Sequence, residues 1–221
     1  MNKKKQKKLD ILYEDKEIIV VNKKEKQLCI STSKEKEHTL YSEVSQYVKK
    51  QYPKNKIFIV HRLDKDTSGI VLFAKNEKMK KLLQQNWNEI TTKEYFAVVE
   101  GTIPKKKDCL KHYLKETKTL QVYVTEDKKN GKLAITNYEV LKENKTNSLL
   151  KIQIKTGRKN QIRVQLSFIG HPIVGDKKYN AKTNPIRRVA LHASRLELIH
   201  PITKKVMVFE SKIPSNFEKI V

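Results

Sequence analysis

The clearest alternation of apolar and polar positions lies between residues 57 and 76. An apolar run, IFIV at 57–60, precedes the polar segment HRLDKDTSG, and a second apolar run, IVLFA at 70–74, follows it. Short apolar runs bounded by polar residues and glycine are typical of buried strands. The pattern therefore predicts two strands joined by a polar loop, and loops held by rigid strands often carry functional side chains.

Two segments have the periodicity of amphipathic helices. In residues 38–53, and again in residues 76–90, apolar side chains recur at intervals of three or four. This spacing predicts two helices, each with one apolar face that packs in the core. Thr39 and Asn76 stand at their starts, where a side-chain oxygen can cap the first turn, and Pro53 ends the first helix.

Further strands are predicted from alternating and β-branched runs, which suit a pleated, half-buried backbone. They form an opening hairpin around the EDKE turn and the segments 93–101, 119–127, 133–141, 148–155 and 188–211, the last a hairpin turning at 200–201. The NG pair at 130–131 favours positive φ in the turn between two of these strands. Asn160 can cap a short helix that is closed by Gly170 and Pro172.

The predicted strands outnumber the helices, and no internal repeat or long linker divides the chain. We therefore expect an α+β fold in which residues 10–221 form a single domain, with a mostly antiparallel sheet flanked by helices and loops. Residues 1–9 carry five lysines and almost nothing that can be buried. They are expected to form a flexible basic arm.

The charge of the chain narrows its function. It has 48 Lys and Arg against 24 Asp and Glu, a net charge of +24, which predicts a polyanionic partner, and nucleic acid is favoured over a membrane surface. Most of the excess is lysine, so the attraction is expected to be diffuse rather than base-specific. Cys29 and Cys109 lack the spacing of a zinc site. The chain has no long apolar run and no secretory signal, and we expect it in the cytoplasm, away from membranes.

The loop at 61–69 concentrates polar chemistry in a few positions. Seven of its first eight residues are polar or charged: His61, Arg62, Asp64, Lys65, Asp66, Thr67 and Ser68. Asp and Ser are also ordinary turn residues, and Gly69 can supply a positive φ. Taken alone, the loop leaves a plain turn and a catalytic loop equally open.

The segment HRLDKDTSGIVLFAKN at 61–76 resembles the signature HRLDxxTSG, followed by an apolar run and AK, of the pseudouridine synthases that include the ribosomal large-subunit enzymes A, C and D. Three other family motifs are similar to KEYFAVVEG (93–101), the segment from TGRK to GDKKY (156–179) and LHASRLELIHPIT (191–203). The resemblance covers about residues 10–215. The chain departs from the family's usual residues at Lys24, Lys26, Lys159, Asn160 and Gln165.

The resemblance implies roles for individual residues. Asp64 would be the catalytic carboxylate, Arg163 its ion-pair partner, and Tyr95 the residue that lies against the target base. Arg62 would fill the gap left by a uridine that flips out of the RNA. Other substrate-binding residues are expected at His61, Thr67, Arg158, Gln161 and Leu191. The resemblance also implies the family's fold without a separate N-terminal RNA-binding domain, and we expect a monomer with no metal.

Pseudouridine formation breaks the N1–C1′ bond of uridine and joins C5 to C1′ without a net change in oxidation state, so no cofactor is expected. Asp64 could attack C1′ or C6, or assist elimination at C2′, and the sequence does not choose among these routes. Arg163 is expected to lower the pKa of the carboxylate and to hold its rotamer. His192 and His200 are expected to be structural.

Other function classes stay open at this point. A non-catalytic RNA-binding or ribosome-associated protein would explain the charge but not the set of motifs. A hydrolase could use Asp64 and Asp66 as acid and base on a glycosidic bond. A metal-dependent nuclease is disfavoured because the carboxylates and histidines lack ligand spacing. The sequence does not indicate whether the RNA is ribosomal or transfer RNA, or which uridine is modified.

Overall fold

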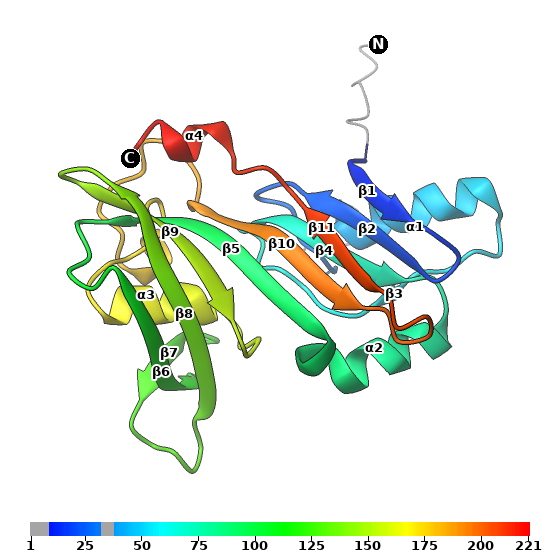
Figure 1. Ribbon diagram of the computed structural model, residues 1–221, viewed down its shortest axis with the longest axis horizontal. Helices are drawn as coiled ribbons and strands as arrows, with labels where there is room; N and C mark the ends of the chain where they lie inside the picture. The colour runs from blue at the N-terminus through cyan, green and yellow to red at the C-terminus, as the bar shows by residue number, and fades with distance from the viewer. Residues whose placement is uncertain (1–8, 32–37) are drawn as a thin grey trace.

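The computed structural model describes residues 9–31 and 38–221 (Figure 1). The predicted basic arm falls largely on residues 1–8, which lie outside the described residues. The helices are α1 (Leu40–Gln51), α2 (Glu77–Ile90), α3 (Gln161–Phe168) and α4 (Ser215–Glu218), with one 3-10 turn, η1 (Lys177–Tyr179). The strands are β1 (Ile11–Glu14), β2 (Ile18–Lys23), β3 (Phe58–Ile59), β4 (Ser68–Ala74), β5 (Thr91–Glu100), β6 (Lys107–Glu116), β7 (Val122–Thr125), β8 (Lys132–Glu143), β9 (Asn147–Ile154), β10 (Leu191–Ile199) and β11 (Val206–Glu210).

These strands form one sheet. Its order is β1-β2-β4-β10-β5-β9-β8-β6-β7, with β3 paired to β4 and β11 paired to β10. The described strand pairs are antiparallel except β4 with β10, which run parallel over two residue pairs. The predicted α+β fold with a mostly antiparallel sheet is confirmed. Strands β4, β10 and β5, which are far apart in the sequence, meet at the centre of the sheet (Figure 1).

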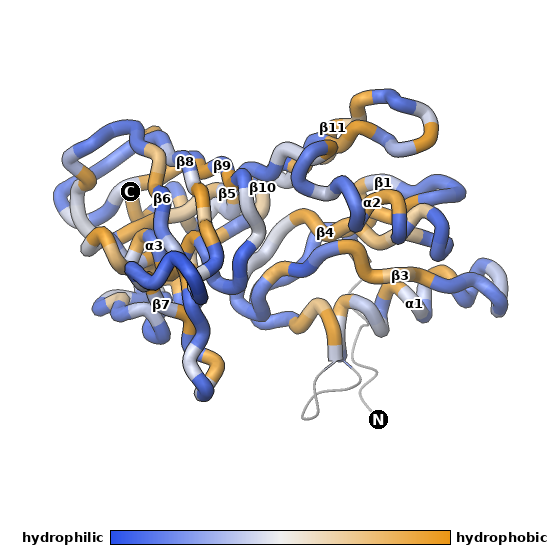
Figure 2. Tube along the Cα trace, turned by 90° about the horizontal axis from the view of Figure 1, so that it is seen from below, coloured by the Kyte–Doolittle hydropathy of each residue, from blue (hydrophilic) through white to orange (hydrophobic). Residues whose placement is uncertain are grey.

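Both faces of β4 are covered by a helix. Helix α1 packs on the face that carries Val71 and Phe73, and α2 packs on the face that carries Ile70 and Leu72. Alternate side chains of a strand point to opposite faces, so a strand covered on both faces needs an unbroken apolar run. IVLFA is such a run, and Figure 2 shows apolar positions along β3 and β4. Burial of each of these side chains contributes about 1.5–3 kcal/mol to folding.

Two of the three predicted helix caps are confirmed. Thr39 accepts a hydrogen bond from the N–H of Ser42 at 3.1 Å, and Asn76 caps α2 in the same way. The predicted cap of α3 at Asn160 is wrong. Asn160 has a φ of 53° and makes no capping bond, because its Oδ1 accepts from Arg163 Nη1 at 3.3 Å while its Nδ2 donates to the Tyr179 hydroxyl at 2.9 Å. The side chain of Asn160 therefore bonds to other side chains and not to the N-terminus of α3.

The positive φ predicted for the 130–131 turn is also wrong. Neither Asn130 nor Gly131 adopts it. The turn is instead shaped by Asp127, whose carboxylate accepts hydrogen bonds from the N–H groups of Lys129 and Asn130. A Cβ at Gly131 would lie 2.7 Å from the Asp127 carbonyl oxygen, so the close approach of the backbone, and not φ, requires glycine there.

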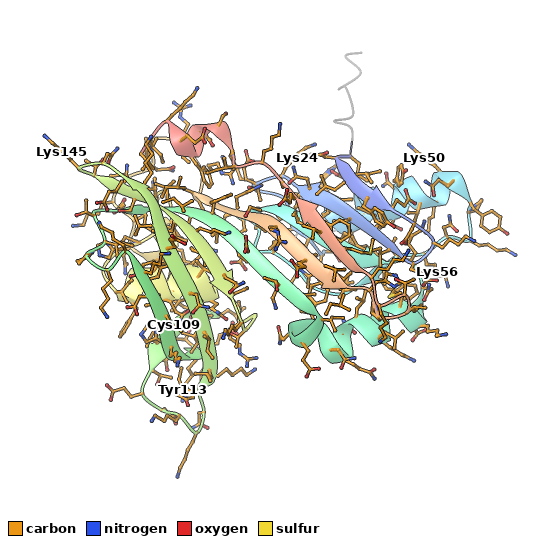
Figure 3. The ribbon with its side chains drawn as sticks, viewed as in Figure 1. Lys24, Lys50, Lys56, Cys109, Tyr113 and Lys145 are labelled. Carbon is orange, nitrogen blue, oxygen red and sulfur yellow. The ribbon has the colours of Figure 1, made fainter. Side chains whose placement is uncertain are left out.

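The lysines that dominate the charge are spread over the molecule. Lys24, Lys50, Lys56 and Lys145 project from widely separated elements in Figure 3. This distribution agrees with the predicted diffuse attraction for a polyanion. Both cysteines are free thiols. Among the residues that the structure describes, no helix is both long and apolar enough to span a bilayer.

Candidate active site

A pocket of about 90 Å³ lies where the loop between β3 and β4 meets β5, the N-terminus of α3 and the start of β10. Most of the site residues predicted from the sequence line it: Arg62, Asp64, Thr67, Tyr95, Arg158, Gln161, Arg163 and Leu191. The sheet brings them together because β10 pairs with both β4 and β5. The rest of the lining is Leu63, Ile154, Gly157, Asn160 and Ile162.

The loop that carries Asp64 is held to the sheet at two points. Lys23 on β2 is 1 % exposed, and its ammonium donates to the carbonyl oxygen of Lys65 at 3.1 Å. Burial lowers the pKa of Lys23 to about 8. At the start of β4, Gly69 has a φ of 114°, and a Cβ there would lie 2.1 Å from the Ala193 carbonyl oxygen. Because the backbone of the loop is anchored, the partly exposed side chain of Asp64 is presented to the pocket.

The loop at 24–28, where the chain departs from the family's usual proline and glycine, still forms a tight turn. The Lys23 ammonium donates to the carbonyl oxygens of Lys24 and Gln27 at 2.8 and 2.7 Å. Lys26 adopts a φ of 60°, the left-handed region that favours glycine. The buried ammonium therefore organises the turn at a position where a side chain is strained.

Arg163 binds two carboxylates at once. Its Nε and Nη2 donate to Asp176 Oδ2 and Oδ1 at 2.6 and 2.7 Å, and its Nη1 donates to Asp64 Oδ2 at 3.3 Å. Burial favours the neutral guanidine, but the hydrogen bonds and charge of Asp176, followed by those of Asp64, outweigh it and raise the pKa of Arg163. The expected contact with Asp64 is present, yet the shorter, bidentate contact is with Asp176.

Asp176 is a site residue to which the sequence analysis assigned no role. It is 1 % exposed, and both of its carboxylate oxygens accept from Arg163. It lies in GHPIVGD, one of the segments that resembles a family motif, so a buried acid there was the available signal. Nothing in the sequence showed which cation it meets, because the two residues are brought together by the chain between α3 and η1.

Tyr95 projects from β5 into the pocket. Burial, together with the charge of Asp64, raises the pKa of the phenol. Within residues 9–31 and 38–221 its hydroxyl has no hydrogen-bond partner. The pocket therefore contains a neutral phenol with an unpaired hydroxyl near the Asp64 carboxylate.

His61, which is expected to bind substrate, does not line the pocket. Its Nε2 accepts a hydrogen bond from the N–H of Leu72 at 3.0 Å, and its ring stacks on Trp87 with 4.6 Å between the centroids. Burial, followed by the charge of Lys93, lowers the pKa of His61 to about 3. His61 is a neutral structural residue that joins the loop to β4 and α2.

The two histidines expected to be structural are confirmed as such. His192 bridges two hydroxyls, with 2.8 Å from Nδ1 to Ser68 Oγ and 3.0 Å from Nε2 to Ser211 Oγ. His200 Nδ1 accepts hydrogen bonds from two N–H groups of the turn that follows it. Neither histidine lines the pocket.

Gln161 lines the pocket but uses its amide within the protein. Its Oε1 accepts from Thr156 Oγ1 and from the N–H of Arg158, at 2.7 and 3.0 Å, while its Nε2 donates to Thr136 Oγ1 at 2.8 Å. It therefore shapes the turn at 156–158. Arg158 is exposed, and its Nε donates to the carbonyl oxygen of Leu133 at 3.0 Å.

Comparison with known proteins assigns the chain to a class of RNA-modifying enzymes. Residues 17–168 match the family described as RNA pseudouridylate synthase. The chain belongs to this family and is an isomerase that acts on RNA, converting uridine to pseudouridine.

Curated relatives, which are longer than this chain, agree with this assignment. The chain is 31% identical over 217 residues to the uncharacterized RNA pseudouridine synthase YhcT of Bacillus subtilis, covering 96% of this chain and 71% of YhcT. It is 33% identical over 232 residues to the ribosomal large subunit pseudouridine synthase D of Buchnera aphidicola subsp. Acyrthosiphon pisum, covering 96% and 72%. The solved structure of human RNA pseudouridylate synthase domain containing 4 has the same fold, with a TM-score of 0.79 and 23% identity over 95% of this chain and 90% of that one.

Proposed function

We propose that Asp64 is the nucleophile of uridine isomerisation, acting on a uridine that has flipped out of a structured RNA. One observation carries the proposal. Among the described residues, Asp64 is the only acidic side chain that lines the pocket, and the guanidinium of Arg163 stands 3.3 Å from it. A carboxylate must be ionised to attack carbon, and an adjacent buried cation stabilises that form.

The isomerisation needs one nucleophile and one route for a proton. The N1–C1′ bond breaks, C5 bonds to C1′, and the C5 proton leaves while N1 gains one, so atoms and electrons balance. As the nucleophile, Asp64 could attack C1′ or C6; the alternative with the same carboxylate is an elimination in which Asp64 takes the C2′ proton as a base. Tyr95 supplies the face on which the base stacks. Because the raised pKa keeps its phenol neutral, its hydroxyl is suited to relaying the C5 proton through water rather than to acting as a direct base.

Extrusion of the base is required because a stacked uridine hides its reacting atoms. Arg62 is exposed at the edge of the pocket, where it can occupy the place of the extruded base. Thr67 and Leu191 are buried in the pocket wall and would contact the uridine from the side. Arg158 would meet the RNA backbone. We propose that the enzyme acts as a monomer.

Large-subunit ribosomal RNA is the first substrate to test. One support is the net charge of +24, which suits a large structured polyanion. The other is the name of several relatives, the ribosomal large subunit pseudouridine synthases D. Transfer RNA is the alternative that the same test addresses.

The pocket does not favour a hydrolase that uses a pair of carboxylates. Asp66 does not line the pocket, and the nearest approach of its Oδ2 to Arg163 is 4.0 Å. Asp176 is buried beneath Arg163 with both oxygens engaged. A second acid is therefore not placed to act on a glycosidic bond held beside Asp64.

The decisive experiment compares Asp64→Asn with Asp66→Asn, the same change two residues away in the same loop. RNA labelled with tritium at C5 of uridine releases the label when pseudouridine forms. We expect Asp64→Asn to abolish release while filter binding of the RNA stays within about twofold, and Asp66→Asn to retain release. Turnover by Asp64→Asn near that of the wild type would remove Asp64 from this role. Free uracil among the products would indicate a hydrolase.

The substrate itself is identified by sequencing cellular RNA after a pseudouridine-specific adduct has been formed. Strains with and without this protein are compared. We expect at least one uridine to lose its adduct when the protein is absent and to regain it with the wild type but not with Asp64→Asn. An unchanged adduct map would overturn the proposed activity on cellular RNA.

A further inference from the structure

A second, larger cavity adjoins the candidate active site. Its volume is about 440 Å³, and it shares Gly157 and Arg158 with the wall of the first pocket. Its other walls are the end of β6, the start of β7 and the start of β8. Tyr113, labelled in Figure 3, lies one residue before this end of the β6 wall. The two cavities are neighbours across the turn at 157–158.

The walls of the second cavity carry a net positive charge. Two of its four cationic side chains are already paired with carboxylates. Arg158 and Lys132 are not paired: within the described part of the chain neither has an acidic partner, and both are exposed. Arg158 is held in place by its bond to the Leu133 carbonyl oxygen. Two unneutralised cations that line one cavity suit a phosphodiester.

Gly157 separates the two cavities and is not explained by the fold. Its φ lies outside the left-handed region, and a Cβ placed on it would meet no atom within 4 Å. Neither backbone conformation nor packing therefore requires glycine at this position. A position without a side chain between two cavities leaves room for another chain to pass close to the backbone.

We propose that the second cavity binds the nucleotide next to the target uridine, with the connecting phosphodiester crossing Gly157 and contacted by Arg158 and Lys132. Leu114 and Val122, both buried, give the neighbouring base an apolar surface. The inference rests on the proposed function, since it places the RNA strand on one side of the extruded uridine. It makes Leu114, Val122 and Lys132, which line the cavity, determinants of which sequence context is accepted.

Lys132→Gln tests the phosphate contact, and Lys145→Gln is the matched control. Both lysines are exposed, and Lys145 follows the opposite end of β8 (Figure 3). The substrate is an unmodified transcript of the RNA that the adduct map identifies. For Lys132→Gln we expect KM to rise about tenfold, as for the loss of one bond to a charged group, with kcat little changed. The magnitude of the slope of log K against log[salt], where K is the association constant for the RNA, should decrease by about one. Lys145→Gln should change KM by less than about twofold.

Gly157→Ala tests the crossing point. Because the added methyl group meets open space, the melting temperature should stay at the wild-type value or rise slightly. Turnover of the RNA should still fall about tenfold in kcat/KM, since the methyl group occupies the path of the phosphodiester. A Gly157→Ala enzyme with unchanged kcat/KM, or equal effects of Lys132→Gln and Lys145→Gln, would overturn the proposal. If the wild type forms no pseudouridine in any RNA, the proposed function fails instead, so the two failures are distinct.

Discussion

Arg163→Lys tests whether one guanidinium must serve two carboxylates. In the structure the guanidinium makes three charge-assisted bonds, two to Asp176 and one to Asp64. The ammonium of lysine is a single nitrogen on a differently shaped stem, so it cannot reproduce a bidentate fork to one acid while also reaching the other. Whichever carboxylate it keeps, the other loses its partner.

The size of the effect of Arg163→Lys follows from the burial of the Arg163–Asp176 pair. Arg163 is 5 % exposed and Asp176 is 1 % exposed. Removal of one partner from a buried ion pair costs about 3–5 kcal/mol, so a lysine that keeps Asp64 should lose that much in the free energy of unfolding. A bond to a charged group contributes about 1.5–3 kcal/mol. A lysine that keeps Asp176 should instead slow single-turnover pseudouridine formation about 10- to 100-fold, because the Asp64 contact is lost.

Urea unfolding measures the first quantity and tritium release measures the second. The control is Arg195→Lys, because Arg195 is ion-paired with Glu197 and Glu210 but is 26 % exposed. Exposed pairs contribute about 1 kcal/mol or less, so this variant should unfold and react nearly as the wild type does. An Arg163→Lys protein that matched the Arg195→Lys control in both assays would refute the two-carboxylate reasoning.

Two further results are expected from single substitutions at Tyr95 and His192. Tyr95→Phe keeps the stacking face but removes the hydroxyl, so we expect kcat to fall about 100-fold or more with KM unchanged; single-turnover rates within a few-fold of the wild type would restrict Tyr95 to stacking. Burial, followed by the charge of Arg188, lowers the pKa of His192 to about 4. The folded state therefore holds this imidazole neutral, and its contribution to stability is complete above pH 6.5 and is lost as the pH falls toward 4. Over that window His192 should account for about 3 kcal/mol of the decrease, and urea unfolding of His192→Asn should show a shallower pH dependence; an equally steep decrease would contradict the assignment.

The local elements of this protein are well predicted from its sequence, because their causes are local. The unbroken apolar run at 70–74 indicates a strand covered on both faces, and Thr39 and Asn76 mark helix starts through bonds to N–H groups three residues on. The turn at 130–131 shows the limit of such signals. Its geometry is determined by Asp127, which lies outside the two residues that carry the turn signal.

The composition of the site was likewise within reach of the motifs, but its connections were not. The motifs at 61–76 and 156–179 place Asp64 and Arg163 at one pocket, as expected. Asn160 does not cap α3. His61, at the start of the polar loop at 61–69, points away from the pocket and stacks on Trp87. Which way a polar side chain turns depends on the neighbours that the fold supplies.

The sequence by itself determined most of the helices and strands, though not β6 or α4, the net charge that suits RNA, and the short list of residues from which the site is built. The tertiary structure decided that Arg163 is shared between Asp176 and Asp64, and that Gly157 lies between two cavities. The physical reason is that periodicity and capping arise from contacts within a few residues of the chain. The ion pairs and the pocket of the site arise where β4, β5, β10 and α3 meet, and the second cavity arises between β6, β7 and β8; no local sequence pattern predicts these contacts.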